Sequence, residues 1–233
     1  MIVLMSAFLL LSAFSCGGGN KANSTSEQSE ETAVNVPQFD ADSAYLYVKN
    51  QVDFGPRVPN TKEHVACGNY LAGQLEAFGA QVTNQYADLI AYDGTLLKAR
   101  NIIGSYKPES KKRIALFAHW DTRPWADNDP DEKNHNTPIL GANDGASGVG
   151  ALLEIARLVN QQQPELGIDI ILLDAEDYGA PQFYTGQHKE EFWCLGSQYW
   201  ARNPHVQGYN ARFGILLDMV GGEGSVFMKE GYS

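Results

Sequence analysis

The 233-residue sequence has only three cysteines, no cluster of basic residues, and no apolar run long enough to cross a bilayer as a mature helix. Its 17 Lys and Arg face 28 Asp and Glu, which gives a formal net charge of -11. Phosphate backbones repel so acidic a chain, and this argues against nucleic-acid binding. The sequence also lacks a P-loop, a dinucleotide fingerprint and the Gly-x-Ser-x-Gly elbow of serine hydrolases.

The N-terminal segment has the composition of a targeting sequence. Residues 1–15 are almost wholly apolar, and small residues precede Cys16, as in the lipobox of bacterial lipoproteins. No Lys or Arg precedes the apolar run, so an ordinary cleaved signal is the alternative. We expect residues 1–16 to be a lipoprotein signal peptide, and the polar residues 17–37 to be a disordered tether. This predicts an exported protein, periplasmic or anchored to the outer membrane through Cys16.

The two remaining cysteines, Cys67 and Cys194, show neither a nucleophile signature nor a disulfide framework. Export to an oxidising compartment leaves a disulfide between them possible. Two free thiols are the favoured interpretation.

Residues 38–233 have the size and apolar content of one domain. The continuous apolar run 114–118 and the largely apolar segment 168–173, which contains Asp169, predict strands that are buried on both faces. The alternation of strand and helix patterns predicts an α/β fold, a mixed and mainly parallel central sheet with helices on both faces. The expected helices are 40–51, 62–78, 141–160 and 193–202. The expected strands are 81–91, 96–105 (interrupted at 99–101), 112–120, 167–173, a third buried strand at 213–217, and a short piece at 226–228.

Groups that can bind a metal follow these strands or start a helix: His119 and Asp121, Asp144, Glu176 and Asp177, and Asp218. Ligands bind at the carboxyl ends of the strands in open α/β sheets, and several carboxylates at one edge repel each other unless a cation lies between them. Imidazole and carboxylate ligands without cysteine suit zinc in an open catalytic site.

Each of these residues also has an ordinary structural explanation. Asp144 can cap a helix, and His119 can be a hydrogen-bonded core histidine. Asp218 can cap a turn, while Glu176 and Asp177 can lie in a solvated loop. Their common position at strand ends favours a metal site over four separate coincidences. Trp193, after a polar loop, is either a core residue or an aromatic wall for a substrate.

Several motifs carry a resemblance to a known family. Residues 118–127 read Ala-His-Trp-Asp-Thr-Arg-Pro-Trp-Ala-Asp, residues 141–148 read Gly-Ala-Asn-Asp-Gly-Ala-Ser-Gly, and residues 173–177 read Leu-Asp-Ala-Glu-Asp. Together with Phe-Gly-Pro-Arg at 54–57, they resemble the bacterial glutaminyl cyclases over roughly residues 40–233. Zinc aminopeptidases share the order of the acids, but they usually lack the extension after the first histidine.

The resemblance implies a glutaminyl-peptide cyclotransferase with a zinc aminopeptidase-like fold, which converts the N-terminal glutamine of peptides and proteins to pyroglutamate and releases ammonia. It implies one zinc ion per subunit with Asp144 and Asp177 as ligands. It also implies catalytic and substrate-binding roles for five other residues: Glu176 as general acid/base, Asp218 at the substrate amine, and His119, Asp121 and Trp193 lining the substrate site.

The third zinc ligand of that family is a histidine well downstream of the Asp218 strand, and no histidine follows Asp218 here. We therefore expect the C-terminal part of the domain to be missing and the sheet to be incomplete. Two alternatives stay open. One is a zinc aminopeptidase, in which His119 and Asp218 would hold a second metal. The other is an inactive scaffold lipoprotein.

Overall fold

The computed structural model describes residues 35–227 of the chain. The expected signal peptide, Cys16 and most of the expected tether lie outside these residues. Within the described residues, those from Pro37 onward form one compact unit. Among the described residues, no helix has both the length and the apolar character needed to cross a membrane.

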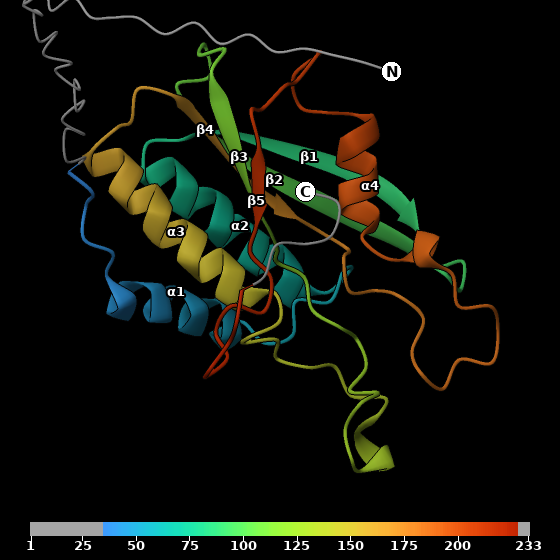
Figure 1. Cartoon of the computed structure of the whole chain (residues 1–233). Helices are drawn as coiled ribbons and strands as arrows, with labels where there is room; N and C mark the ends of the chain where they lie inside the picture. Colours follow the sequence, from blue (N-terminus) through green and yellow to red (C-terminus); the bar gives the residue numbers. More distant parts are fainter. Residues whose placement is uncertain (1–34, 228–233) are drawn as a thin grey trace, which may run out of the picture. The chain divides into compact units, whose positions relative to one another are not determined.

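A five-stranded mixed sheet forms the centre of this unit, in the order β1-β2-β4-β3-β5 (Figure 1). The pairs β3–β4 and β3–β5 are parallel, whereas β1–β2 and β2–β4 are antiparallel. The predicted α/β fold with a mixed sheet is confirmed. The strands are β1 (Gln81–Ile90), β2 (Leu96–Tyr106), β3 (Arg113–His119), β4 (Gly167–Leu173) and β5 (Gly214–Leu216).

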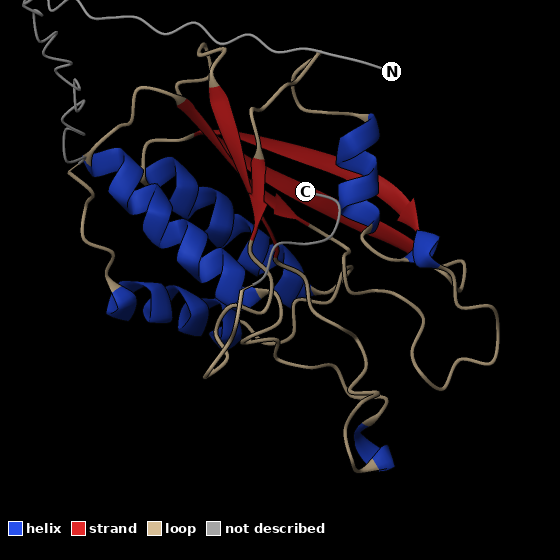
Figure 2. Cartoon of the chain, in the orientation of Figure 1, coloured by secondary structure: helices blue, strands red, loops and turns tan. Residues whose placement is uncertain are grey.

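Helices cover both faces of the sheet, as Figure 2 shows. On one face lie α2 (Lys62–Ala77) and α3 (Ala146–Gln161), with α1 (Ala41–Asp53) packed on α3. On the opposite face lies α4 (Leu195–Arg202), whose Trp200 packs edge-on against Phe117. Two short 3-10 helices, Glu132–Asn134 and Glu190–Phe192, interrupt the long loops after β3 and β4.

The apolar run of β4 contributes to both cores. Ile168, Ile170 and Leu172 belong to the cluster under α2 and α3, while Ile171 and Leu173 belong to the cluster on the α4 face. Successive residues of a strand point to opposite faces, so a strand buried on both faces is apolar at nearly every position. The exception in β4 is Asp169, which is buried and paired with Arg113. This part of the sequence interpretation is confirmed.

Three expectations for individual strands were wrong. Strand β5 is not buried: Ile215 is 45% and Leu216 62% exposed, because among the described residues β5 pairs only with β3. Residues 226 and 227 form no strand, and Met228 lies outside the described part. Strand β2 runs without interruption through residues 99–101, because the buried polar side chains of Arg100 and Asn101 find hydrogen-bond partners.

Candidate active site

The parallel register explains why the predicted site residues meet. His119 pairs with Leu173 across β3–β4, and Phe117 pairs with Leu216 across β3–β5. The three strands therefore end at the same edge of the sheet. This edge carries His119 at the end of β3, the acid pair after β4 and Asp218 after β5. The long loops after β3 and β4 project from this same end (Figure 2).

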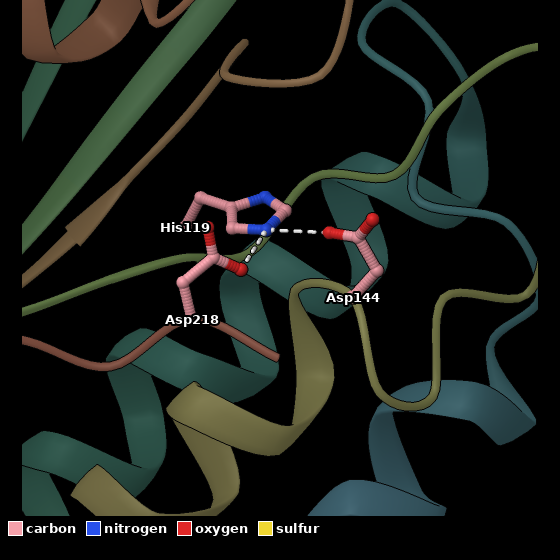
Figure 3. A group of neighbouring side chains, drawn as sticks. All are labelled: His119, Asp144 and Asp218. Atoms are coloured by element: carbon pink, nitrogen blue, oxygen red, sulfur yellow. Dashed lines mark ion pairs between the residues drawn. The ribbon is translucent and has the colours of Figure 1, made fainter. Parts of the chain in front are cut away.

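His119 lies between two carboxylates (Figure 3). Its Nε2 is 2.9 Å from Asp144 Oδ1 and 3.5 Å from Asp218 Oδ1. One ligand atom from each of these three residues lies within 4.8 Å of the others, close enough to hold a metal ion. Both ring nitrogens are buried, and neither has a partner with the alignment of a hydrogen bond. The contacts are thus electrostatic, and the ring is free to serve as a ligand.

Charge around His119 changes its protonation. Burial alone would lower the pKa of His119, but contacts with Asp121, Asp144 and Asp218 outweigh burial and hold its pKa well above the ordinary value. The imidazolium in turn lowers the pKa of Asp218. The protonated ring thus supplies the positive charge that the carboxylates require, and a bound metal ion would supply it instead.

The turn that carries Asp144 is constrained from several sides. Gly141 and Gly145 have φ values of +56° and +88°, and a β-carbon at either would overlap neighbouring atoms. The buried Arg57 guanidinium donates to the Trp120, Leu140 and Gly141 carbonyls, joining the His119 strand to this turn. Gly145 is the N-cap of α3 and no side chain caps the helix, so the Asp144 carboxylate is not used for capping.

The acid pair after β4 is held by Asp121, which is fully buried. Its Oδ1 accepts the backbone N–H of Glu176 and its Oδ2 accepts that of Asp177, each at 3.1 Å. Asp121 Oδ1 also lies 3.5 Å from His119 Nδ1. The side chain predicted to line the substrate site is thus turned towards the backbone of the acid pair.

Only one of the two carboxylate oxygens of Asp177 has a positively charged partner among the described residues. Arg123 donates to its Oδ1 at 3.3 Å, while its Oδ2 is buried without a partner. Burial and the nearby Asp144 and Asp121 carboxylates raise the pKa of Asp177 to about 8. An unpartnered carboxylate oxygen in such a cluster is costly, and a divalent cation is the group that this donor set fits.

Glu176 differs from Asp177 in its surroundings. Burial raises its pKa, and the positive charge of His119 opposes that rise. Its Oε2 lies 3.9 Å from His119 Nδ1, and its Oε1 accepts from the Cys194 thiol at 3.1 Å. A half-buried carboxyl group with a raised pKa is suited to taking up and returning a proton near neutral pH.

Arg123 organises the rim of the site. Its guanidinium binds both oxygens of Asp127 at 2.7 and 2.6 Å, and lies 4.9 Å from the centre of the Trp193 ring. Burial would lower its pKa, but Asp127 and Asp177 outweigh burial and raise it. Trp193 is therefore held at the site by a cation–π contact rather than buried in the core. A cavity of about 270 Å³ lies beside Arg123, lined by residues that include Trp125, Ile139 and Asp144.

A larger cavity, of about 470 Å³, lies at the other end of the sheet, among Ser105, Arg113 and Tyr209. The buried acid of that region, Asp169, accepts hydrogen bonds from all three of these side chains. The buried acid of this region is therefore fully paired, in contrast to Asp177.

Comparison with known proteins now decides the family. Residues 101–232 match the model of Peptidase family M28. The chain belongs to this family. M28 relatives of known structure include Zn-dependent exopeptidases, which agrees with the possible His/Asp/Asp metal site of this family member.

Solved structures and curated proteins give a finer comparison. The structure of Bacteroides thetaiotaomicron glutaminyl cyclase bound to N-acetylhistamine is 94% identical, covers 85% of this chain and 68% of that chain, and has a TM-score of 0.84. A leucine aminopeptidase precursor from Bacteroides thetaiotaomicron VPI-5482 matches with the same four values. Drosophila melanogaster glutaminyl-peptide cyclotransferase is 24% identical over 78% of this chain and 50% of that protein. The chain spans a smaller share, 32%, of another curated relative, from Escherichia coli (strain K12).

The structure brings the predicted metal and catalytic residues to one end of the sheet, with differences in detail. Among the described residues, the group of three that could hold a metal ion is His119, Asp144 and Asp218, which includes one of the two predicted zinc ligands, Asp144. Sequence reasoning gave no role to Cys194 or to the contacts of Arg57. No periodic pattern marks either residue, and Cys194 is 18 positions from Glu176, the acid that it contacts.

Proposed function

We propose that this chain is part of a glutaminyl-peptide cyclotransferase, which converts the N-terminal glutamine of peptides and proteins to pyroglutamate and releases ammonia. The 94% identity to a glutaminyl cyclase over 85% of this chain carries the proposal. The Arg123–Trp193 contact beside the acid pair supports it, because an aromatic wall can hold a curled glutamine side chain and exclude water.

We further propose that one zinc ion binds per subunit, with Asp144 and Asp177 as ligands. The unpartnered Oδ2 of Asp177 and its raised pKa support a cation there. A catalytic zinc site has three protein ligands, so this assignment needs a third ligand besides Asp144 and Asp177. When bound, zinc would act as a Lewis acid on the γ-carbonyl of the glutamine.

Each site residue then has a separate role in the reaction. Glu176 takes a proton from the α-amine of the substrate, and the amine nitrogen bonds to the γ-carbonyl carbon. Glu176 returns that proton to the side-chain nitrogen, whose bond to the carbon breaks as ammonia leaves. The Asp218 carboxylate, 44% exposed at the site, holds the amine, while His119 and Trp193 line the pocket. Asp121 positions the backbone that carries Glu176.

The deciding experiment uses the full-length gene product and a peptide that begins with glutamine. We expect the peptide to lose the mass of one ammonia, and a zinc chelator to abolish the loss. A matched peptide that begins with asparagine controls for non-enzymatic deamidation. Loss of a whole residue would replace this proposal with an aminopeptidase. An unchanged peptide and a protein without zinc would point to an inactive scaffold.

The aminopeptidase is the second candidate, because His119, Asp144 and Asp218 already lie within coordinating distance of one position. One of the two structures that are 94% identical is described as a leucine aminopeptidase precursor. A second metal held by His119 and Asp218 would give two zinc ions per subunit. Zinc content of the purified protein, with and without the His119→Ala change, therefore separates the two candidates.

We also propose, from the sequence alone, that Cys16 is lipidated and anchors the protein to a membrane after export. Small residues before Cys16 and the polar segment after it support the proposal. In a bacterial host, the wild-type protein is expected to incorporate labelled palmitate and to sediment with membranes. The Cys16→Ser variant should do neither, and Cys67→Ser should behave as wild type. Equal labelling of Cys16→Ser and wild type would exclude the anchor.

A further inference from the structure

The loop that carries Glu176 is paired along its backbone with the start of α4. Three consecutive amides, those of Cys194, Leu195 and Gly196, donate to the carbonyls of Glu176, Ala175 and Asp174, each at 3.0 Å. On the opposite side, Asp121 accepts the amides of Glu176 and Asp177. The acid loop is therefore hydrogen-bonded on both sides, and little freedom is left to its backbone.

We infer that Cys194–Gly196 is a positioning clamp for the acid loop, and that the Cys194 thiol is a positioning residue that orients the carboxyl group of Glu176. The inference rests on the proposed function, in which Glu176 moves the proton. The inference gives the start of α4 a role that is separate from metal binding and from substrate binding.

The backbone of the clamp is fitted closely to the loop. Gly196 is buried, and a β-carbon there would overlap the Asp174 carbonyl oxygen and the Asn101 side chain. Asn101 joins both segments, since its Oδ1 accepts the Asp174 amide and its Nδ2 donates to the Gly196 carbonyl. Asn101 of β2 thus holds the clamp against the acid loop.

Two residues of the clamp and the loop adopt left-handed backbone conformations without being glycine. Ala175 has a φ of +51° and Cys194 a φ of +54°. L-residues with side chains rarely adopt this region, and where they do the surrounding contacts must hold them there. At Cys194 the conformation coincides with the contact that the side chain makes to Glu176.

The thiol distinguishes the two oxygens of Glu176. Cys194 Sγ donates to Oε1 at 3.1 Å, while Oε2 faces His119 at 3.9 Å. Burial, together with the nearby Glu176 charge, raises the pKa of Cys194 to about 12, so the thiol keeps its proton and remains a donor. With Oε1 held by Cys194, Oε2 is the oxygen that faces the metal-site side.

The test uses three variants of Cys194 that separate the donor from the backbone. Cys194→Ser keeps a donor, Cys194→Ala removes it, and Cys194→Gly removes it while relieving the left-handed backbone. We expect kcat of the Ala and Gly variants to fall about fivefold, the rate equivalent of one ordinary hydrogen bond, with KM and zinc content unchanged. The Ser variant should retain wild-type kcat, and the Gly variant should unfold at a temperature no lower than the Ala variant.

Equal kcat in the wild type and the Ala variant would overturn the inference. An equal loss in the Ser and Ala variants would also overturn it, because shape and not donation would then matter. If the wild type released an amino acid instead of ammonia, the proposed function would fail. The same comparison of variants would still test the clamp, because that reaction also needs an acid/base. Crystal structures of the variants supply a readout without turnover: we expect a single Glu176 rotamer in Cys194→Ser and more than one in Cys194→Ala.

Discussion

Replacement of Glu176 with glutamine is expected to lower kcat by roughly 10²–10⁴-fold, the usual contribution of a positioned acid/base. Glutamine has nearly the same shape and can still accept from the Cys194 thiol, but it cannot take a proton from the substrate amine. Because Glu176 is not among the proposed zinc ligands, zinc content should stay at the wild-type level. The measurements are steady-state release of ammonia from a glutamine peptide and metal analysis of the same preparation.

The matched control is Glu191→Gln, the same change at an acid whose side chain is 64% exposed and pairs with Lys189. This variant should keep wild-type kcat. A Glu176→Gln enzyme that turned over at the wild-type rate would remove Glu176 from the proton transfer. A variant that had lost its zinc would instead make Glu176 a ligand, and the metal assignment would need revision.

Replacement of Arg57 with leucine is expected to lower the free energy of unfolding by at least about 3 kcal/mol, since hydrogen bonds that involve a charged group each contribute about 1.5–3 kcal/mol. Arg57 is fully buried and donates to three carbonyls, those of Trp120, Leu140 and Gly141. Leucine would leave these carbonyl oxygens buried without a donor. Urea denaturation followed by circular dichroism measures the effect.

Zinc affinity is a second readout for the Arg57→Leu variant. The guanidinium joins the strand that ends in His119 to the turn that carries Asp144, so the folded Arg57→Leu protein should also bind zinc more weakly. The control is Arg202→Leu, an exposed arginine with a side-chain contact at 3.5 Å to Gln198, where the change should stay within about 0.5 kcal/mol. Equal stabilities of the two variants would show that the buried carbonyls do not depend on Arg57.

The sequence predicts the structure best for the central strands, whose apolar residues match their position between two layers of helices. The run 114–118 is continuous in apolar residues, and 168–173 is apolar apart from Asp169, because both faces of β3 and β4 are covered. Neighbouring parallel strands end at the same edge, so the polar residues that follow each run are brought together. The convergence of His119, the acid pair and Asp218 was predictable for this reason.

Edge strands do not follow the same rule. The segment 213–217 has the apolar composition of a buried strand, and it pairs with β3, but the side chains of β5 are exposed. Burial of a strand depends on whether another element packs against it, and the composition of the strand does not show whether such an element is present. In β2 the reverse occurs, because polar residues that suggested an interruption are buried and paired.

The sequence by itself determined the α/β architecture, the strand ends that carry the site and the residue types suited to a divalent cation, because these depend on short-range periodicity and on side-chain chemistry. Only the tertiary structure decided that Asp121 binds the backbone of the acid pair, that Arg123 links Asp127, Asp177 and Trp193, and that Cys194 contacts Glu176. Most of these contacts join segments far apart in the chain through single side chains. The direction of a single side chain is set by three-dimensional packing rather than by any repeat along the sequence.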